Sequence, residues 1–149
     1  MPATFETARD EIRAAVKTVW DAGTTAVAGY VPAMFYDGVP SASDPDPAKA
    51  YARMNVRHVS GRQASLAGPD GRRRYEKLGI VVVSVFAPIG AAGGQTLGER
   101  LAQVAKDALE GRATASGVWF RDAVIAEVGA SGPWDQFDVT ADFRYDEFK

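Results

Sequence analysis

The run Gly79 to Phe86, almost continuously apolar and rich in valine, constrains the fold of this chain more than any other stretch. It is far shorter than the ~20 residues that a membrane-spanning helix needs, and β-branched residues favour strands. A strand without alternation of polar and apolar residues is typical of one covered on both faces. We therefore predict a central strand within residues 72–88, covered on both faces and antiparallel to the strand before it.

Other segments have the alternation of strands with one wet face. The chain is expected to be extended from Tyr51 to Leu66, with a break near Ser60-Gly61, and its residues alternate between apolar and polar over Ala52–His58. The same alternation recurs from Trp134 to Phe148. We predict a further strand at about Val118–Val128 and a short extended piece at Ala33–Tyr36, closed by Asp37-Gly38. The sequences Gly68-Pro69-Asp70-Gly71 and Gly129 to Pro133 are typical of the turns between such strands.

Two segments have the periodicity of half-buried helices. The first, about Phe5 to Asp21, is expected to have Thr4 as its N-cap and to stop at Gly23. The second follows a glycine-rich link, begins with a capping box formed by Thr96 and Glu99, and ends at Gly111.

The order of these elements is helix, several strands, helix, two strands. Hairpin-linked strands combined with helices indicate an α+β fold, with a mostly antiparallel sheet and two main helices packed on one face. At 149 residues the chain is long enough for one domain and short for two. We expect a single domain over 1–149, with an exposed loop at about 38–49 because prolines interrupt residues 40–47.

Composition excludes several kinds of site. The chain has no cysteine, which excludes disulfides, thiolate nucleophiles and iron–sulfur ligation. Its one histidine, His58, cannot supply a multi-histidine metal site. The start, Met1 to Thr4, lacks the charged and apolar regions of a signal peptide. We expect no metal, no cofactor and no membrane partner, and a protein made in the cytoplasm.

The segment Gly90 to Thr96 is the most tempting catalytic motif, because it follows an apolar strand and opens a helix as a phosphate-binding loop does. However, Ile89 replaces the first required glycine and Gln95 the required lysine, so we favour a simple connection. A small nucleotide-binding enzyme is the competing interpretation, and it predicts thermal stabilisation by nucleotides. His58 lies on a half-apolar strand face, where a structural role is commoner than catalysis. We expect no catalytic residue and no enzyme activity.

Charge is unevenly distributed along the chain. Residues 51–78 carry seven basic residues against two acidic ones, and residues 122–149 carry seven acidic residues against two basic ones. The two groups could be ordinary solvated faces that neutralise each other as neighbours in the sheet. They could instead be complementary patches that meet between copies of the chain. A third interpretation is that Arg72-Arg73-Arg74 contacts phosphate in a small nucleic-acid-binding module.

An ordered series of short motifs extends over about two thirds of the chain, from Tyr51 to Glu147. It comprises Gly61–Leu66, Arg73–Tyr75, Val85–Gly90, Glu110-Gly111, Gly117–Asp122, Glu127–Gly129, Gly132-x-Trp134-x-Gln136 and Phe143–Glu147. The series resembles the small tail-terminator, or tail-completion, proteins of long-tailed bacteriophages and prophages. Asp138 and Glu76 depart from the family pattern, and we expect both to affect surface charge.

The resemblance implies a structural virion protein of the phage tail, assembled in the cytoplasm of the host bacterium. It implies a homo-oligomeric ring, usually a hexamer, that caps the completed tail tube and stops polymerisation of the tube protein. The ring would present a surface to the head–tail connector of the neck, and DNA would pass through its lumen without sequence readout. A head–tail connector protein is a neighbouring alternative.

Charge and resemblance together suggest where copies of the chain meet. We expect Arg53 and Arg57 of one subunit to pair with Asp138 and Asp142 of the next. The loop around Gly68–Arg74, which includes Arg72, Arg73 and Arg74, and the loop Pro40–Pro47 are further candidates for contacts between subunits or with the tube.

Overall fold

A computed structural model describes residues 3–41, 43–66, 68, 70–90 and 94–149. It contains three helices and five strands within these ranges. In chain order they are α1 (Phe5–Gly23), α2 (Thr25–Ala28), β1 (Ala33–Tyr36), β2 (Tyr51–Gln63), β3 (Arg74–Pro88), α3 (Gly94–Leu109), β4 (Trp119–Ser131) and β5 (Trp134–Phe148). Pro69 of the expected turn and residues 91–93 of the glycine-rich link lie outside the described residues.

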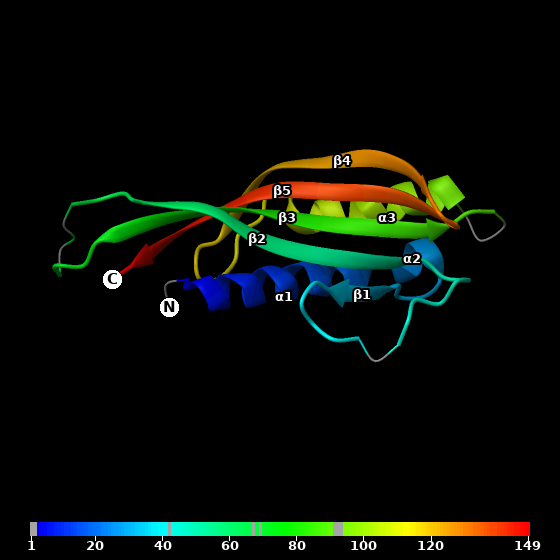
Figure 1. Ribbon diagram of the computed structural model, residues 1–149, viewed down its shortest axis with the longest axis horizontal. Helices are drawn as coiled ribbons and strands as arrows, with labels where there is room; N and C mark the ends of the chain where they lie inside the picture. Colours follow the sequence, from blue (N-terminus) through cyan, green and yellow to red (C-terminus); the bar gives the residue numbers. More distant parts are fainter. Residues whose placement is uncertain (1–2, 42, 67, 69, 91–93) are drawn as a thin grey trace.

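The strands form one sheet in the order β1-β2-β3-β5-β4, in which only the short β1 runs parallel to its neighbour. The two long helices pack on one face of this sheet, α3 behind β3 and β5, and α1 beside α3 and under β2 (Figure 1). The predicted α+β class, with a mostly antiparallel sheet and two main helices on one face, is confirmed. None of the described helices combines the length and apolarity that crossing a bilayer requires.

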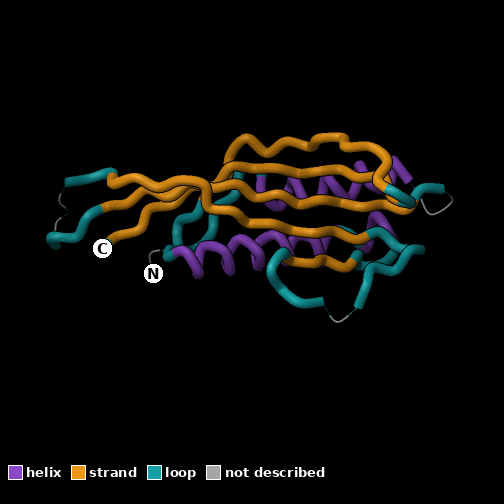
Figure 2. Tube along the Cα trace, viewed as in Figure 1, coloured by secondary structure: helices purple, strands orange, loops and turns teal. Residues whose placement is uncertain are grey.

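The central position of β3 is confirmed, but its predicted coverage on both faces is wrong. Val81, Val83 and Val85 are fully buried against the helices. Ile80 and Val82 point to the opposite side and are only half-buried, because no described element of this chain covers that side. We call this second side the open face (Figure 2). The run from Gly79 to Phe86 therefore presents apolar side chains to both faces of the sheet, although the described elements bury only one of these faces.

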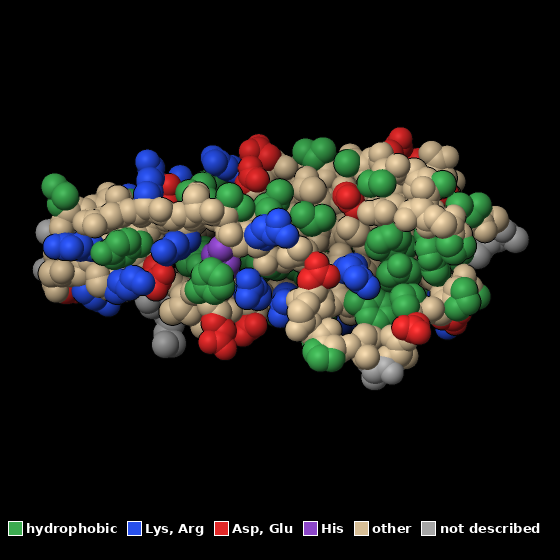
Figure 3. All heavy atoms as spheres, viewed as in Figure 1, with side chains coloured by type: hydrophobic (Ala, Val, Ile, Leu, Met, Phe, Trp, Pro, Cys, Tyr) green, Lys and Arg blue, Asp and Glu red, His purple; other side chains and the backbone are tan. Residues whose placement is uncertain are grey.

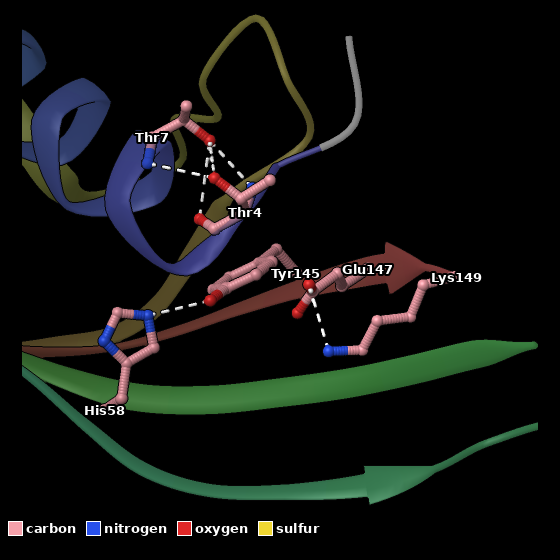
Figure 4. Close-up of polar contacts among 6 residues, drawn as sticks. All are labelled: Thr4, Thr7, His58, Tyr145, Glu147 and Lys149. Carbon is pink, nitrogen blue, oxygen red and sulfur yellow. Dashed lines mark hydrogen bonds and ion pairs between the residues drawn. The ribbon is translucent and has the colours of Figure 1, made fainter.

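The N-terminus of α1 agrees with its prediction, whereas that of α3 does not. Thr4 caps α1 as predicted: its hydroxyl accepts from the Thr7 amide, and the Thr7 hydroxyl accepts from the Thr4 amide (Figure 4). The predicted capping box at Thr96 and Glu99 is wrong, because α3 already begins at Gly94 and Thr96 lies within it. Gly98 of α3 lies so close to the Phe137 ring that an added Cβ atom would overlap it.

Strand boundaries follow the predictions closely. The break in β2 is a register shift between His58 and Ser60, next to the expected position. The turn between β4 and β5 is shorter than expected, because β4 continues to Ser131. Gly129, with φ of 94°, lies at a second register shift within β4. The described part of the loop at 38–49 is exposed, apart from an intermediate Pro45.

Three strands continue beyond the helices and form an arm. It consists of residues 60–63 of β2, 74–78 of β3 and 144–148 of β5, which pair with one another in register. Figure 1 shows the arm at the left, with the C-terminus at its end. Leu66, just beyond the β2 part of the arm, is 90% exposed. The described part of the chain thus offers two surfaces without a helix over them, the open face and the arm.

Candidate interaction surface

The open face is built by every second residue of β2, β3 and β5. Successive side chains of a strand point to opposite faces, so the residues between the buried ones share this side. The strand register aligns them in three rows across the sheet. These rows are Arg53–Ser84–Asp138, Asn55–Val82–Thr140 and Arg57–Ile80–Asp142.

Charge on the open face is separated by strand. Arg53 and Arg57 lie on β2, while Asp138 and Asp142 lie on β5, two strands and therefore ~10 Å away. Among the described side chains, neither arginine forms an ion pair with either aspartate. The basic and acidic segments are neighbours in one sheet, as the first sequence interpretation proposed, but a strip of β3 keeps these four side chains apart.

Two hollows lie beside this strip. One, of about 350 Å³, is bordered by Asp37 together with side chains of β2 and β3, including Arg53, Arg57 and Ile80. The other, of about 380 Å³, lies towards β4 and includes Ile80, Arg121 and Asp142. Figure 3 looks onto this face, with charged side chains over its middle. The residues predicted at 53, 57 and 142 therefore border surface depressions that a partner could fill.

An aromatic cluster occupies the end of the open face where β2 begins and β3 ends. Tyr51 stacks on Phe86 with ring centroids 4.7 Å apart, and Phe35 and Trp134 meet the Tyr51 ring edge-on. All four side chains are half-buried. Hydrophobic side chains gather at this end in Figure 3. Sequence periodicity gives no sign of this cluster, because its members come from four strands.

Arg72, Arg73 and Arg74 lie at the arm, apart from the other predicted residues. All three are exposed. The Arg72 guanidinium lies 3.5 Å from the Asp70 carboxylate, and that of Arg74 lies 3.9 Å from Asp146. The seven predicted interface residues therefore fall into two groups, four on the open face and three at the arm.

Glu76 does not affect surface charge as expected, because it is only 3% exposed. Its carboxylate accepts a hydrogen bond from Arg62 Nε at 3.0 Å and forms an ion pair with Arg144. Each arginine comes from a strand beside β3, so the three residues join all strands of the arm. The basic segment around Glu76 contains Arg62, but Arg144 belongs to the acidic segment 122–149, so only strand pairing reveals the contact.

His58 lies on the helix-covered side, as its alternation predicted. Its Nε2 atom is 2.8 Å from the Tyr145 hydroxyl (Figure 4), and its ring stacks on Phe5 with centroids 3.8 Å apart. Burial, with a smaller contribution from Arg9 and Lys77, lowers the pKa of His58 to about 4. Within the described part of the chain, no three acidic or histidine side chains gather where they could hold a metal ion.

Comparisons with known proteins identify the fold. No family model matches the chain, and no curated protein matches it significantly. One similar solved structure is a protein of unstated function, 18% identical over 92% of this chain and 94% of its own, with a TM-score of 0.62. Another is a chain in the virion of a native gene transfer agent particle. It is 22% identical over 97% of this chain and all of its own, with a TM-score of 0.53. At these identities the likeness shows a shared fold.

Proposed function

We propose that this protein is a structural subunit of a phage-like virion. The observation that carries the proposal is the likeness to the gene transfer agent virion chain, which covers both chains nearly end to end. The motif series that resembles tail-terminator proteins supports the same class independently, since it rests on residues and not on fold. Its segments Gly61–Leu66 and Arg73–Tyr75 belong to the arm and its tip, and Gly117–Asp122 leads into β4.

Within this class, we assign the protein the role of tail terminator. Copies would form a closed ring, usually of six, on the finished tail tube, where the ring stops addition of tube protein. The other side of the ring would meet the head–tail connector, and DNA would pass through the lumen without sequence readout. The role is structural, without catalysis, and assembly takes place in the host cytoplasm.

A ring requires each subunit to present two different surfaces, one to each neighbour. The arm supplies one such surface, since it projects beyond the helices and carries Arg72 and Arg73 in exposed positions. We propose that these arginines contact an acidic surface of the adjacent subunit. Because such contacts lie between exposed charges, ring assembly should weaken as salt rises.

The competing function is nucleic-acid binding through Arg72, Arg73 and Arg74, which their exposure favours. Asp70 and Asp146 each lie near one of these arginines and reduce the positive potential of the arm. A duplex-binding module would bind DNA with a steep dependence on salt. A ring subunit would assemble without DNA.

Negative-stain imaging and solution mass test the ring directly. The purified protein is expected to form closed rings of several copies, and to arrest tube growth when it is added to polymerising tail-tube protein. Arg72→Glu with Arg73→Glu should reduce both ring formation and tube arrest, whereas Arg112→Glu, an exposed arginine after α3, serves as the matched control. A protein that forms no rings at high concentration and does not slow tube growth would contradict the proposal.

A further inference from the structure

Each charged row of the open face has a basic residue at one end and an acidic residue at the other. Such a row is complementary in charge to a copy of itself that runs in the opposite direction. Read from β2 to β5, the outer rows run from arginine through β3 to aspartate, Arg53 to Asp138 and Arg57 to Asp142. The middle row runs from Asn55 to Thr140, both uncharged. Reversing the direction of each row therefore places a basic residue opposite an acidic one at both charged levels.

We propose that the open face binds the open face of a second copy of this chain, about a two-fold axis parallel to β3. Such a rotation places β2 of one copy over β5 of the other and leaves each row at its own level along the strands. Arg53 then faces Asp138 of the other copy, and Arg57 faces Asp142, with both contacts formed twice. The contact goes beyond the proposed ring, because an isologous contact closes at two copies.

Charge selects this axis over the other symmetric arrangement. A two-fold axis across the strands would keep β2 over β2 and would place Arg53 opposite Arg57 and Asp138 opposite Asp142. Like charges juxtaposed in an interface cost several kcal/mol. The arrangement along β3 replaces all these repulsions with attractions, so the charged residues specify the orientation.

Apolar side chains supply the driving force for the contact. Ile80 and Val82 of β3 lie on the axis and meet their own counterparts, and both are half-buried in the single chain. The aromatic cluster of Phe35, Tyr51, Phe86 and Trp134 lies on the same face and would be covered with them. The hollow bordered by Arg53, Asn55 and Arg57 would receive β5 of the other copy.

The size of the face predicts a modest affinity. The part of the sheet between the aromatic cluster and the Arg57 row offers ~600 Å² of surface, somewhat below the ~800 Å² per partner of a standard interface. When two sheets stack in the aligned manner, their strand directions differ by ~30° or less. At this angle each of the three rows can remain opposite the matching row of the other copy. We expect a dimer whose population depends on protein concentration.

Charge exchange tests the contact by analytical ultracentrifugation over a range of concentrations. Arg53→Glu with Arg57→Glu, and separately Asp138→Lys with Asp142→Lys, should each weaken dimerisation at least ~10-fold. An equimolar mixture of the two variants should dimerise again, since every opposed pair is then complementary. The matched control, Arg100→Glu with Arg112→Glu, reverses two exposed arginines outside the open face and should dimerise like the unaltered protein. A monomer at all concentrations, or variants that do not weaken dimerisation, would overturn the inference.

Cysteine crosslinking tests the axis itself, because the chain has no cysteine of its own. Ser84 lies on β3 and therefore faces Ser84 of the other copy across the ~10 Å that separates stacked sheets. This is too far for a disulfide, so Ser84→Cys should be linked into a dimer by a short bis-maleimide reagent. Ala126, in the same row on β4, lies two strands from the axis. Ala126→Cys should remain uncrosslinked. Crosslinking of the second variant but not the first would exclude this axis.

Crosslinking and ring imaging distinguish a wrong two-fold contact from a wrong ring. Rings that form and arrest tubes, with no Ser84→Cys crosslink, would retain the terminator function and exclude the two-fold contact. Crosslinked dimers without rings or tube arrest would support the contact and contradict the terminator function.

Discussion

The Nε2 atom of His58 lies 2.8 Å from the hydroxyl oxygen of Tyr145, and this contact joins β2 to β5 where the arm leaves the sheet (Figure 4). Burial raises the pKa of Tyr145 to about 12, so the hydroxyl stays protonated at neutral pH. His58 is held neutral by its lowered pKa. The base of the arm is therefore fixed by an uncharged hydrogen bond.

Stability should fall as pH drops through the range in which free histidine titrates. The unfolded chain binds a proton on His58 near pH 6.5, whereas the folded chain does so only near pH 4. The contribution of His58 is therefore complete above pH 6.5 and is lost progressively towards pH 4. His58→Gln should reduce the difference in unfolding free energy between pH 7.5 and pH 5 by about 1 kcal/mol, allowing for partial exposure. Urea unfolding at both pH values measures this, and an unchanged difference would contradict it.

Replacement of Glu76 should destabilise the arm and the sheet. Glu76→Gln removes the carboxylate that Arg62 and Arg144 share and leaves both guanidinium groups beside a neutral amide. We expect a loss of about 2 kcal/mol in unfolding free energy, below the ~3–5 kcal/mol of a fully buried pair, because both arginine partners are partly exposed. Arg62→Gln should cost less than about 1 kcal/mol, because the Arg62 side chain is 70% exposed. Equal losses in both variants by urea titration would refute the role assigned to burial.

Gly98→Ala should destabilise the protein although alanine favours helices. The exchange would gain about 1 kcal/mol of helix propensity at an exposed position, but here the new methyl group overlaps the Phe137 ring. We expect a net loss of about 1–3 kcal/mol from overpacking. Phe137→Leu should relieve the overlap, so the double variant should lose less than the sum of the single ones in thermal unfolding. If the stability losses of the single variants add up to that of the double variant, there is no steric contact between the residue at position 98 and Phe137.

The carboxylate of Glu11 should stabilise the fold mainly at neutral pH. It accepts hydrogen bonds from the hydroxyls of Thr114, at 2.6 Å, and Ser116, which attach α1 to the segment before β4. Burial raises its pKa, but the hydrogen bonds from Ser116 and Thr114 outweigh this and hold the pKa below its usual value. The contribution is present above the pKa of the unfolded chain and is lost as pH falls through that of the folded chain.

Glu11→Gln should therefore cost about 1 kcal/mol at pH 7 and little at pH 3, as urea unfolding at the two pH values would measure. Asp10→Asn, a neighbouring exposed carboxylate, is the matched control and should have little effect at either pH. A loss for Glu11→Gln that is as large at pH 3 as at pH 7 would show that the carboxylate charge is not what matters.

Local pattern was sufficient to predict most elements. The alternation through Met54 and Val56 and the helical spacing of Ile12 and Val16 both correspond to buried positions, because side-chain direction repeats every two residues in a strand and every 3.6 in a helix. Local signals failed at the N-terminus of α3. Thr96 has suitable neighbours for an N-cap, but the helix begins at Gly94. They also could not tell that none of the described helices would cover the open side of β3.

Sequence alone determined that this chain forms an α+β fold with basic β2 and acidic β5 segments, since these properties belong to short stretches of residues. Only the tertiary structure decided that Arg53, Ser84 and Asp138 form one row, and that Glu76 is enclosed by Arg62 and Arg144. These relationships depend on strand register between segments far apart in the chain. Register depends on which face of each strand is buried and on the turns between strands, so it is fixed only when these separate segments come together in the sheet.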